Sequence, residues 1–470
     1  MLGFSNTSIS NFLFWVTQKK WFLISISIGL LLHIIGAPYG LSMDGYNALI
    51  ITLTALIMII SEPISLPGIA LYIIISEVFL GLGSPNEVAK SFMNDAVFFI
   101  MGSLMLAVVI IKQGWDARLA LGIIKLTGNK VRNIVVGLLS ISAFLSSFIG
   151  EHTVAAIMLP IGMTIIKYSS KLRSNVDNLS CLILFSIAYG ALIGSVGTPS
   201  GGGRNAIMLN YLGDSNISIS YLRWMYEAYP FVLIQIPIAS FLLLTTFKSE
   251  IKILDSSVRR LVIQVSKLKK MTGRNTMTIV IFFMIFFSWI FLSEKYGLGI
   301  IALTGVLLYM VGGFIRWNDI SKNTHWGVIL LFGSTISLGS YINKTGAAEW
   351  LANKIILIFG SMIKIFPFVA DLITILMTTL LANILSSSAT VAVLGPINMN
   401  LGDDIKHIGL LTAMASSFGF FTAVAAPACT IIYSSGMVKA RDFLKIGWKI
   451  GLISILTLLV YVNIYWSIIN

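Results

Sequence analysis

Two long apolar runs of this 470-residue chain are each interrupted by small polar residues that could bind an ion. The first interruption, residues 147–153, contains Glu151 and His152. The second, residues 385–390, contains three consecutive serines and a threonine. A carboxylate in apolar surroundings is costly unless it is protonated or paired, and hydroxyl and carbonyl oxygens at such interruptions can coordinate a cation. Both segments are therefore candidate ion sites.

Two further apolar runs are broken near the middle by glycine and proline. The first break, residues 197–205, contains Pro199, four glycines and Arg204, and the second, residues 425–430, contains Pro427. A helix that begins at such a break presents unpaired N–H groups and the positive end of its dipole, which favour an anion. Arg204 adds a fixed positive charge, so these residues predict an anion clamp.

The composition places these interruptions in a membrane protein. Hydrophobic residues make up 57% of the chain and charged residues 11%, against roughly 25% charged residues in soluble domains. The mean hydropathy is +0.91, and apolar runs of about 20 residues, long enough to cross a bilayer, recur along the chain. This pattern argues against a soluble enzyme.

The net charge of +13 does not indicate nucleic-acid binding. The basic residues lie between the apolar runs, as the positive-inside rule requires. The two cysteines, Cys181 and Cys429, belong to no CxxC pair and no Cys/His cluster, so neither a disulfide framework nor a metal site is expected.

The apolar runs predict an all-α, multi-pass protein of the inner (plasma) membrane with its N-terminus in the cytoplasm. Two interrupted runs, 134–167 and 368–401, are predicted to be re-entrant hairpins that enter the membrane and return on the same side. This arrangement puts most of the 32 Lys and Arg residues on the cytoplasmic side. The first run is too long for the apolar region of a signal peptide. About eleven transmembrane helices are expected, at residues 21–38, 46–61, 66–82, 96–112, 179–212, 224–247, 276–293, 297–313, 325–342, 406–436 and 446–468.

The chain divides into two halves joined by a basic connector. Residues 246–275 alternate basic and apolar side chains, which favours an interfacial helix on the cytoplasmic leaflet. The predicted sections are a cytoplasmic N-terminal segment (1–20), a first half (21–245) with hairpin 134–167 and broken helix 179–212, the connector (246–275), and a second half (276–470) with hairpin 368–401 and broken helix 406–436.

The two halves repeat the same order of features. A span containing a Phe-Gly-Ser-like segment is followed by a hairpin with a proline (Pro160 or Pro396) and then by a broken helix. The matching spans are the fourth and the ninth, an odd number of crossings apart, so the halves have opposite orientations. Inverted repeats with discontinuous helices are typical of secondary carriers that bind substrate near the midplane.

These motifs resemble the divalent anion/sodium symporter (DASS) family, whose members carry dicarboxylates, citrate or sulfate. The resemblance covers about residues 96–465, and its most specific parts are residues 326–351 and 427–447. The family's hairpin tips carry a Ser-Asn-Thr motif about ten residues before a proline. The matching positions here are residues 150–152 and 386–388.

The resemblance implies a secondary transporter of small divalent anions and not an enzyme. It also implies a homodimer in the lipid bilayer, a mobile transport domain that works by an elevator mechanism, no nucleic-acid partner and no cofactor. The substrate is expected at Glu151, His152, Thr153, Thr198, Arg204, Asn205, Ser387, Ser388, Thr390 and Pro427. The coupling ion, H⁺ or Na⁺, is expected at Gly150, Glu151, Gly197, Ser386, Ser387 and Ala426.

The chain departs from the family motif in ways that put sodium coupling in doubt. Glu151 and His152 replace the first motif, the second motif lacks its asparagine, and the first break gains three glycines and Arg204. A bare carboxylate would repel a dianion, so Glu151 must be protonated or paired with Arg204 or protonated His152. The hypothesis is proton coupling or exchange, and the alternative for Glu151 is a purely structural ion pair. Glu77, inside the third span, has no assigned role.

Two other functions are consistent with parts of the pattern. A cation/proton antiporter or arsenite-type permease would share the inverted repeat, but it would not need Arg204. A membrane hydrolase using Glu151 and His152 lacks the second histidine of an HExxH motif. The residues do not distinguish carboxylates from sulfate, nor symport from exchange.

Overall fold

The computed structural model describes residues 19–61, 63–113, 127–170, 176–254, 273–366, 368–423 and 425–469. Within these ranges the chain is helical, and the β-bridge between Lys130 and Ile253 is isolated. The predicted N-terminal segment lies outside the described residues up to residue 18. Most of the basic connector, residues 255–272, also lies outside them.

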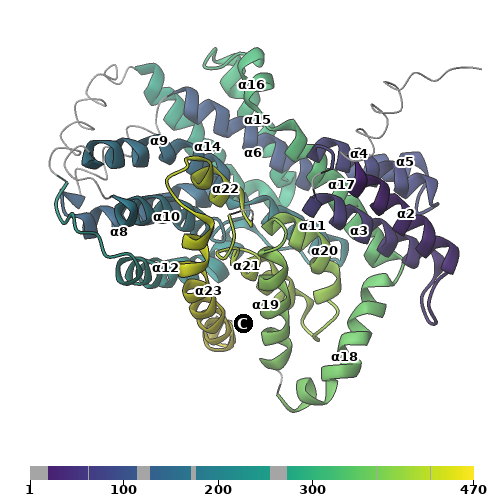
Figure 1. The fold of residues 1–470 in the computed structure, drawn as a ribbon. Coiled ribbons are helices and arrows are strands. Elements are labelled where there is room, and N and C mark those ends of the chain that lie inside the picture. Colours follow the sequence, from purple (N-terminus) through teal and green to yellow (C-terminus); the bar gives the residue numbers. More distant parts are fainter. Residues whose placement is uncertain are drawn as a thin grey trace, which may run out of the picture.

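Figure 1 shows the helices in chain order. The N-terminal group is α2 (Lys20–Ile35), α3 (Met43–Ser61), α4 (Leu66–Phe79), α5 (Pro85–Phe92) and α6 (Asp95–Lys112). The first hairpin and broken helix follow as α8 (Val131–Ile149), α9 (Glu151–Ser170), α10 (Asp177–Gly194), the 3-10 turn η1 (Pro199–Gly201) and α11 (Gly203–Asp214), and α12 (Tyr221–Thr246) completes this half.

The second half begins with α14 (Gly273–Tyr296), α15 (Leu298–Val311), α16 (Trp317–Asn323), α17 (Trp326–Lys344) and α18 (Ala347–Ile365). The second hairpin and broken helix follow as α19 (Phe368–Ala382), α20 (Ser387–Asn398), α21 (Ile405–Ala415) and α22 (Pro427–Ser434). The chain ends with α23 (Ala440–Tyr461), the π-helical η2 (Val462–Trp466) and α24 (Ser467–Ile469).

All of the predicted spans correspond to helices, but several helices are short. By length and apolar composition, seven helices of the described chain can cross a membrane, or eight if the bent pair α5–α6 is one span. The predicted spans at 21–38, 66–82 and 297–313 are α2, α4 and α15, with 16, 14 and 14 residues. Glycine ends two of them early, because Gly36 (φ 87°) and Gly81 (φ 78°) adopt the left-handed backbone that stops a helix.

The predicted inverted repeat appears in how the helices pack. In each half the first arm of the hairpin packs on the first part of the broken helix, α8 on α10 and α19 on α21. The second arms also pack across the halves, α9 on α22 and α20 on α11, in addition to their contacts with α10 and α21 of their own halves. This crossed packing ties the hairpin of each half to the broken helix of the other, so all four interrupted elements share one hydrophobic core.

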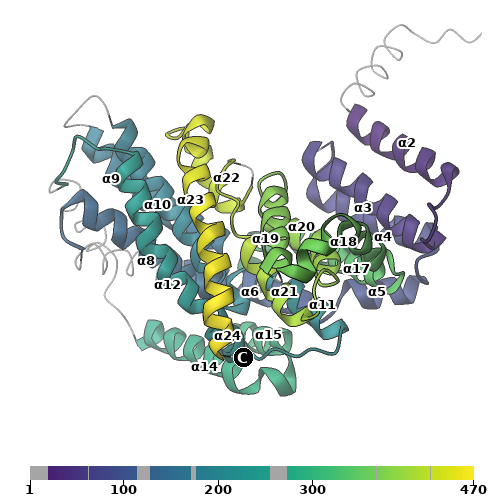
Figure 2. The ribbon, with the colours of Figure 1, turned by 90° about the horizontal axis from the view of Figure 1, so that it is seen from below.

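We call these four interrupted elements, α8–α11 and α19–α22, the central unit. Figures 1 and 2 both place α8–α10 and α12 on one side, α2–α5 and α17 on the other, and α19–α23 between them. A second, smaller core joins α3, α4 and α17. The central unit and the α3–α4–α17 group are therefore packed around separate cores.

A single buried carboxylate, that of Glu227, fixes one end of the central unit. Glu227 of α12 is 1% exposed and accepts hydrogen bonds from Arg223, one turn earlier, and from Lys406 at the start of α21 (Lys406 Nζ to Glu227 Oε1, 2.5 Å). Its backbone oxygen accepts hydrogen bonds from Tyr461 Oη (2.8 Å) and Trp466 Nε1 (2.9 Å). One residue therefore links α12, α21 and the last helical turns.

Replacing Glu227 with alanine is expected to lower the free energy of unfolding by about 2 kcal/mol, because two cations lose a buried, charge-assisted partner. The melting temperature of the purified protein measures the effect. Glu349→Ala, in the exposed first turn of α18, is the matched control and is expected to change stability by less than about 1 kcal/mol. Equal melting temperatures for the two variants would contradict this prediction.

Candidate functional site

The tip of the first hairpin is bonded to the first break. Ser147 Oγ donates to Gly194 O (2.8 Å), and the hydroxyls of Thr198 and Ser200 both donate to Ser147 O. The tip turns at Gly150, whose φ of 83° suits glycine. These bonds place the start of α9 directly against the non-helical segment between α10 and α11.

A buried ion pair lies where the tip and the break meet. Arg204 Nη1 is 2.9 Å from Glu151 Oε2, and the two side chains are 1% and 8% exposed. Ser195 Oγ donates to the same carboxylate oxygen (3.1 Å) and is also bonded to Arg204. The structure therefore pairs Glu151 with Arg204, and Ser195 bridges the pair.

The first break extends over residues 195–202, so it begins two residues before the predicted break at 197–205 and ends three residues earlier. Asn205 holds it in shape, because its Nδ2 donates to Ser195 O (2.8 Å) and to Thr198 O (2.7 Å). Gly197 lies against the ring of Tyr229, where a Cβ would come within 2.6 Å of a ring carbon. The break thus satisfies its own carbonyls with an amide side chain, as backbone away from water requires.

The second tip is bonded to the second break in the same manner. Asn383 Nδ2 donates to Phe418 O (2.9 Å), and its Oδ1 accepts from Phe421 N (2.8 Å). Ser386 caps α20 by accepting from Ala389 N (3.3 Å). The second break covers residues 416–423 and 425–426 and so begins well before the predicted break at 425–430, because Asn383 supplies partners for backbone that the proline alone does not explain.

Contacts between the halves connect the two tip–break pairs. Tyr189 Oη of α10 donates to Phe420 O in the second break (2.8 Å), and Tyr211 Oη of α11 donates to Ala392 O of α20 (3.1 Å). Ala426 is the buried residue before α22, which begins at Pro427 and packs on α9. Within the described residues no hydrogen bond joins residues 150–153 directly to 386–390; the breaks connect them.

Several predicted site residues carry buried polar atoms without a partner in the described chain. Such atoms cost about 1–3 kcal/mol each when they are left unsatisfied, so each of them is a candidate for a ligand contact. They are His152 Nε2, Arg204 Nε, Asn205 Oδ1, Ser387 Oγ and Thr390 Oγ1.

The other predicted residues contribute position more than bonding. Thr153 is buried in the first turn of α9, and Ser388 is half-buried in the first turn of α20. The His152 ring packs edge-on against His325, at the exposed start of α17, with the ring centres 6.0 Å apart. Glu77 is fully buried and accepts a hydrogen bond from Ser337 Oγ of α17 (2.8 Å), which belongs to neither tip.

Sequence reasoning missed two of the residues that build this site, Ser195 and Asn383. Ser195 is one small residue in a serine-rich region, and its position between Arg204 and Glu151 depends on a contact across distant segments. Asn383 had a usable signal, since it is an amide side chain in an apolar hairpin arm, three residues before the serines.

The chain has several known relatives. Residues 17–470 match the family model described as "Sodium:sulfate symporter transmembrane region". The sodium-dependent dicarboxylate transporter SdcS of Staphylococcus saprophyticus is 26% identical over 94% of this chain and 90% of its own length. An uncharacterized transporter of Haemophilus influenzae is 27% identical over 87% of this chain and 89% of its own.

A relative from Caenorhabditis elegans, the sodium-dependent high-affinity dicarboxylate transporter 3, is 25% identical over 86% of this chain and 80% of its own length. Among solved structures, the YdaH transporter of Alcanivorax borkumensis, described as having an unusual topology, matches with a TM-score of 0.52. The match covers 84% of this chain and 89% of that one at 10% identity. This last similarity concerns the fold alone.

Proposed function

Because this chain belongs to the sodium:sulfate symporter family, we propose that it carries small divalent anions, dicarboxylates such as succinate or malate, citrate or sulfate, across the inner membrane as a secondary transporter. The observation that carries the proposal is the buried pair of Arg204 and Glu151. A guanidinium is a suitable bidentate partner for a carboxylate or sulfate. The unpartnered atoms of His152, Ser387 and Thr390 supply further polar contacts.

The pair also supports a coupling mechanism. Arg204 is the only arginine that the described residues place at the tips. While Glu151 is ionised, its carboxylate accepts a hydrogen bond from Arg204 Nη1 and repels an approaching dianion. Protonation of Glu151 would remove that repulsion and release Arg204 to bind the substrate. Proton binding and substrate binding then favour one another, since coupling between two sites is reciprocal. We therefore propose proton coupling or exchange, although named relatives are sodium-dependent.

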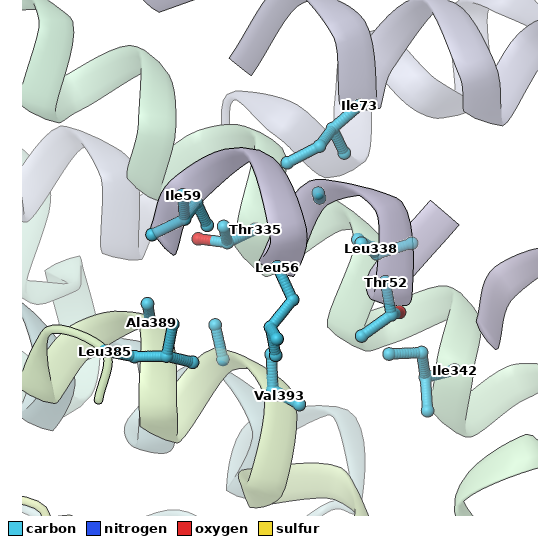
Figure 3. Close-up of a pocket in the computed structure, with 12 residues that line it drawn as sticks. Thr52, Leu56, Ile59, Ile73, Thr335, Leu338, Ile342, Leu385, Ala389 and Val393 are labelled. Carbon is cyan, nitrogen blue, oxygen red and sulfur yellow. The ribbon is translucent and has the colours of Figure 1, made fainter. Parts of the chain in front are cut away.

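An apolar boundary supports movement of the central unit. Figure 3 shows Leu385, Ala389 and Val393 of the second hairpin facing Leu56 and Ile59 of α3 across a small cavity. Twelve residues line this cavity, and apart from Thr52 and Thr335 all are apolar. Apolar surfaces lack directional bonds and can slide. The elevator movement proposed here must, however, exchange two polar links to α17, Ser340 Oγ to Asp214 (2.7 Å) and Tyr211 Oη to Thr335 O (3.3 Å).

The experiment that tests the function is thermal stabilisation of the purified protein by succinate, malate, citrate or sulfate, with and without sodium, at two pH values. A ligand at a hundredfold excess over its Kd stabilises the folded state by about 2.7 kcal/mol. At least one dianion is expected to raise the melting temperature, and to raise it more at the lower pH. Lactate, a monoanion, is the control and is expected to have a smaller effect.

No shift with any of the four anions would contradict the proposal. A shift with monovalent cations or arsenite alone would instead indicate an antiporter or an arsenite-type permease.

A further inference from the structure

A polar cleft lies at the end of α10 that is far from the tips. It has a volume of about 500 Å³ and is formed by the first turns of α10 and α23 together with the connection from α22. The distance along α10 from Asp177 to Gly194 corresponds to about 26 Å, so the cleft is separate from the site at Arg204. Its basic walls come from the segment 427–447, which the candidate function leaves unexplained.

Three cations line the cleft: Lys439, Arg441 and Lys445. All three are exposed, and within the described residues no ion-pair partner is found for them. Arg441 and Lys445 are four residues apart on one face of α23, where like charges repel. An anion placed between them would relieve that repulsion and gain two charge-assisted hydrogen bonds.

The two acidic residues of the cleft, Asp177 and Asp442, lower the net charge of its side chains from +3 to +1. Asp442 accepts from Lys439 N (2.9 Å) and closes the capping box at the start of α23, and Asp177 has an interaction of its own. The ends of two helices add to the positive potential, because α10 and α23 both begin here. Within the described residues, Val176, the residue before α10, gives this helix no side-chain cap, and an uncapped helix start favours an anion.

We propose that this cleft binds a phosphate group from the cytoplasmic side, as a second anion site distinct from the transport site. A phosphate has the charge and the acceptor oxygens to contact Arg441 in a bidentate manner, with Lys445 as a point charge. The cleft volume falls within the usual range for small-molecule sites. The phosphate can come from a lipid headgroup or from a soluble phosphate ester, and the two sources share this chemistry.

The test uses the full-length protein in nanodiscs and has two arms. In the soluble arm, glycerol 3-phosphate is titrated into protein in phosphatidylcholine nanodiscs, and binding is followed by thermal stabilisation. In the lipid arm, phosphatidylcholine nanodiscs are compared with nanodiscs that also contain phosphatidylglycerol. Each arm is repeated with Arg441→Gln/Lys445→Gln and with the control Lys449→Gln. Lys449 lies one turn further along α23 and hydrogen-bonds Thr246 outside the cleft.

Wild type and Lys449→Gln are expected to be stabilised in at least one arm, and the double variant is expected to bind about tenfold or more weakly. Stabilisation only in the lipid arm would identify a headgroup site, and stabilisation only in the soluble arm a metabolite site. Absence of stabilisation in both arms, or equal stabilisation of the double variant, would overturn the proposal.

Stabilisation by succinate is measured for every variant as well. A variant that succinate stabilises is folded and has an intact transport site, whatever its response to phosphate. If the double variant does not fold, the single variant Lys445→Gln takes its place. A variant that responds to succinate but not to phosphate loses the cleft alone.

Discussion

Uptake of substrate into proteoliposomes is expected to fall by about a hundredfold or more when Arg204 is replaced with glutamine. Arg204 is the buried cation at the first tip, and its loss removes the partner of a bound dianion. The same change leaves Glu151 buried without a counter-charge, which costs about 3–5 kcal/mol when the carboxylate stays ionised. Arg204→Gln should therefore reduce both transport and melting temperature. Arg132→Gln, at an exposed position in the first turn of α8, is the control and should change neither.

A double variant separates the two roles of Arg204. In Glu151→Gln/Arg204→Gln neither charge is present, so the protein is expected to recover most of the melting temperature lost in the single variant. Transport should remain absent, because no guanidinium is available to the substrate. Recovery of both stability and transport would mean that Arg204 serves only to neutralise Glu151, and the anion clamp would then be ruled out.

The helices that surround this site could be predicted, because the length of each apolar run and the spacing of its apolar residues determine them. Gly150 and Ser386 occupy the turns of the two hairpins as expected, since a glycine can adopt a positive φ and a serine side chain can cap a helix. Helix α11 begins at Gly203, shortly after Pro199, and α22 begins at Pro427. Both starts lie near the predicted breaks. These features are local, so a single sequence contains them.

The extent of the second break could not be predicted from local signals. Residues 416–423 and 425–426 include phenylalanines and alanines that would suit a helix. They remain non-helical where Asn383, from a different segment, bonds Phe418 and Phe421, and where Tyr189 bonds Phe420. A tertiary contact thus overrides local propensity, and nothing in the order of residues identifies the partner.

The short helix α5 was also absent from the predicted elements. It is polar, eight residues long, and stabilised by a capping box between Ser84 and Glu87. That motif was present in the sequence, but a search for apolar runs passes over polar helices between spans. The number of spans is not affected, since the bent pair α5–α6 counts as one possible span, like the predicted span 96–112.

Replacing Glu151 with glutamine is expected to uncouple transport from the proton gradient. Glutamine resembles the protonated glutamate in size and lacks its charge, so Arg204 is permanently available to the substrate. Uptake by the wild type should rise as the external pH falls, by up to about tenfold per pH unit where the carboxylate is mostly ionised. Uptake by Glu151→Gln should be nearly independent of pH. The measurement is radiolabelled dianion uptake into proteoliposomes over a range of external pH, with and without sodium.

Two further measurements make this prediction specific to coupling. Glu151→Gln should lose accumulation against a gradient but keep counterflow exchange, because its site still binds and releases the substrate. Glu77→Gln is the matched control, because Glu77 is a second buried carboxyl bonded to a serine, and that serine, Ser337 of α17, belongs to neither tip. It should retain the pH dependence of the wild type. Uptake that requires sodium and ignores pH, in the wild type and in Glu151→Gln alike, would show that the Arg204–Glu151 pair is structural. In that case, a cation bound elsewhere at the tips drives transport.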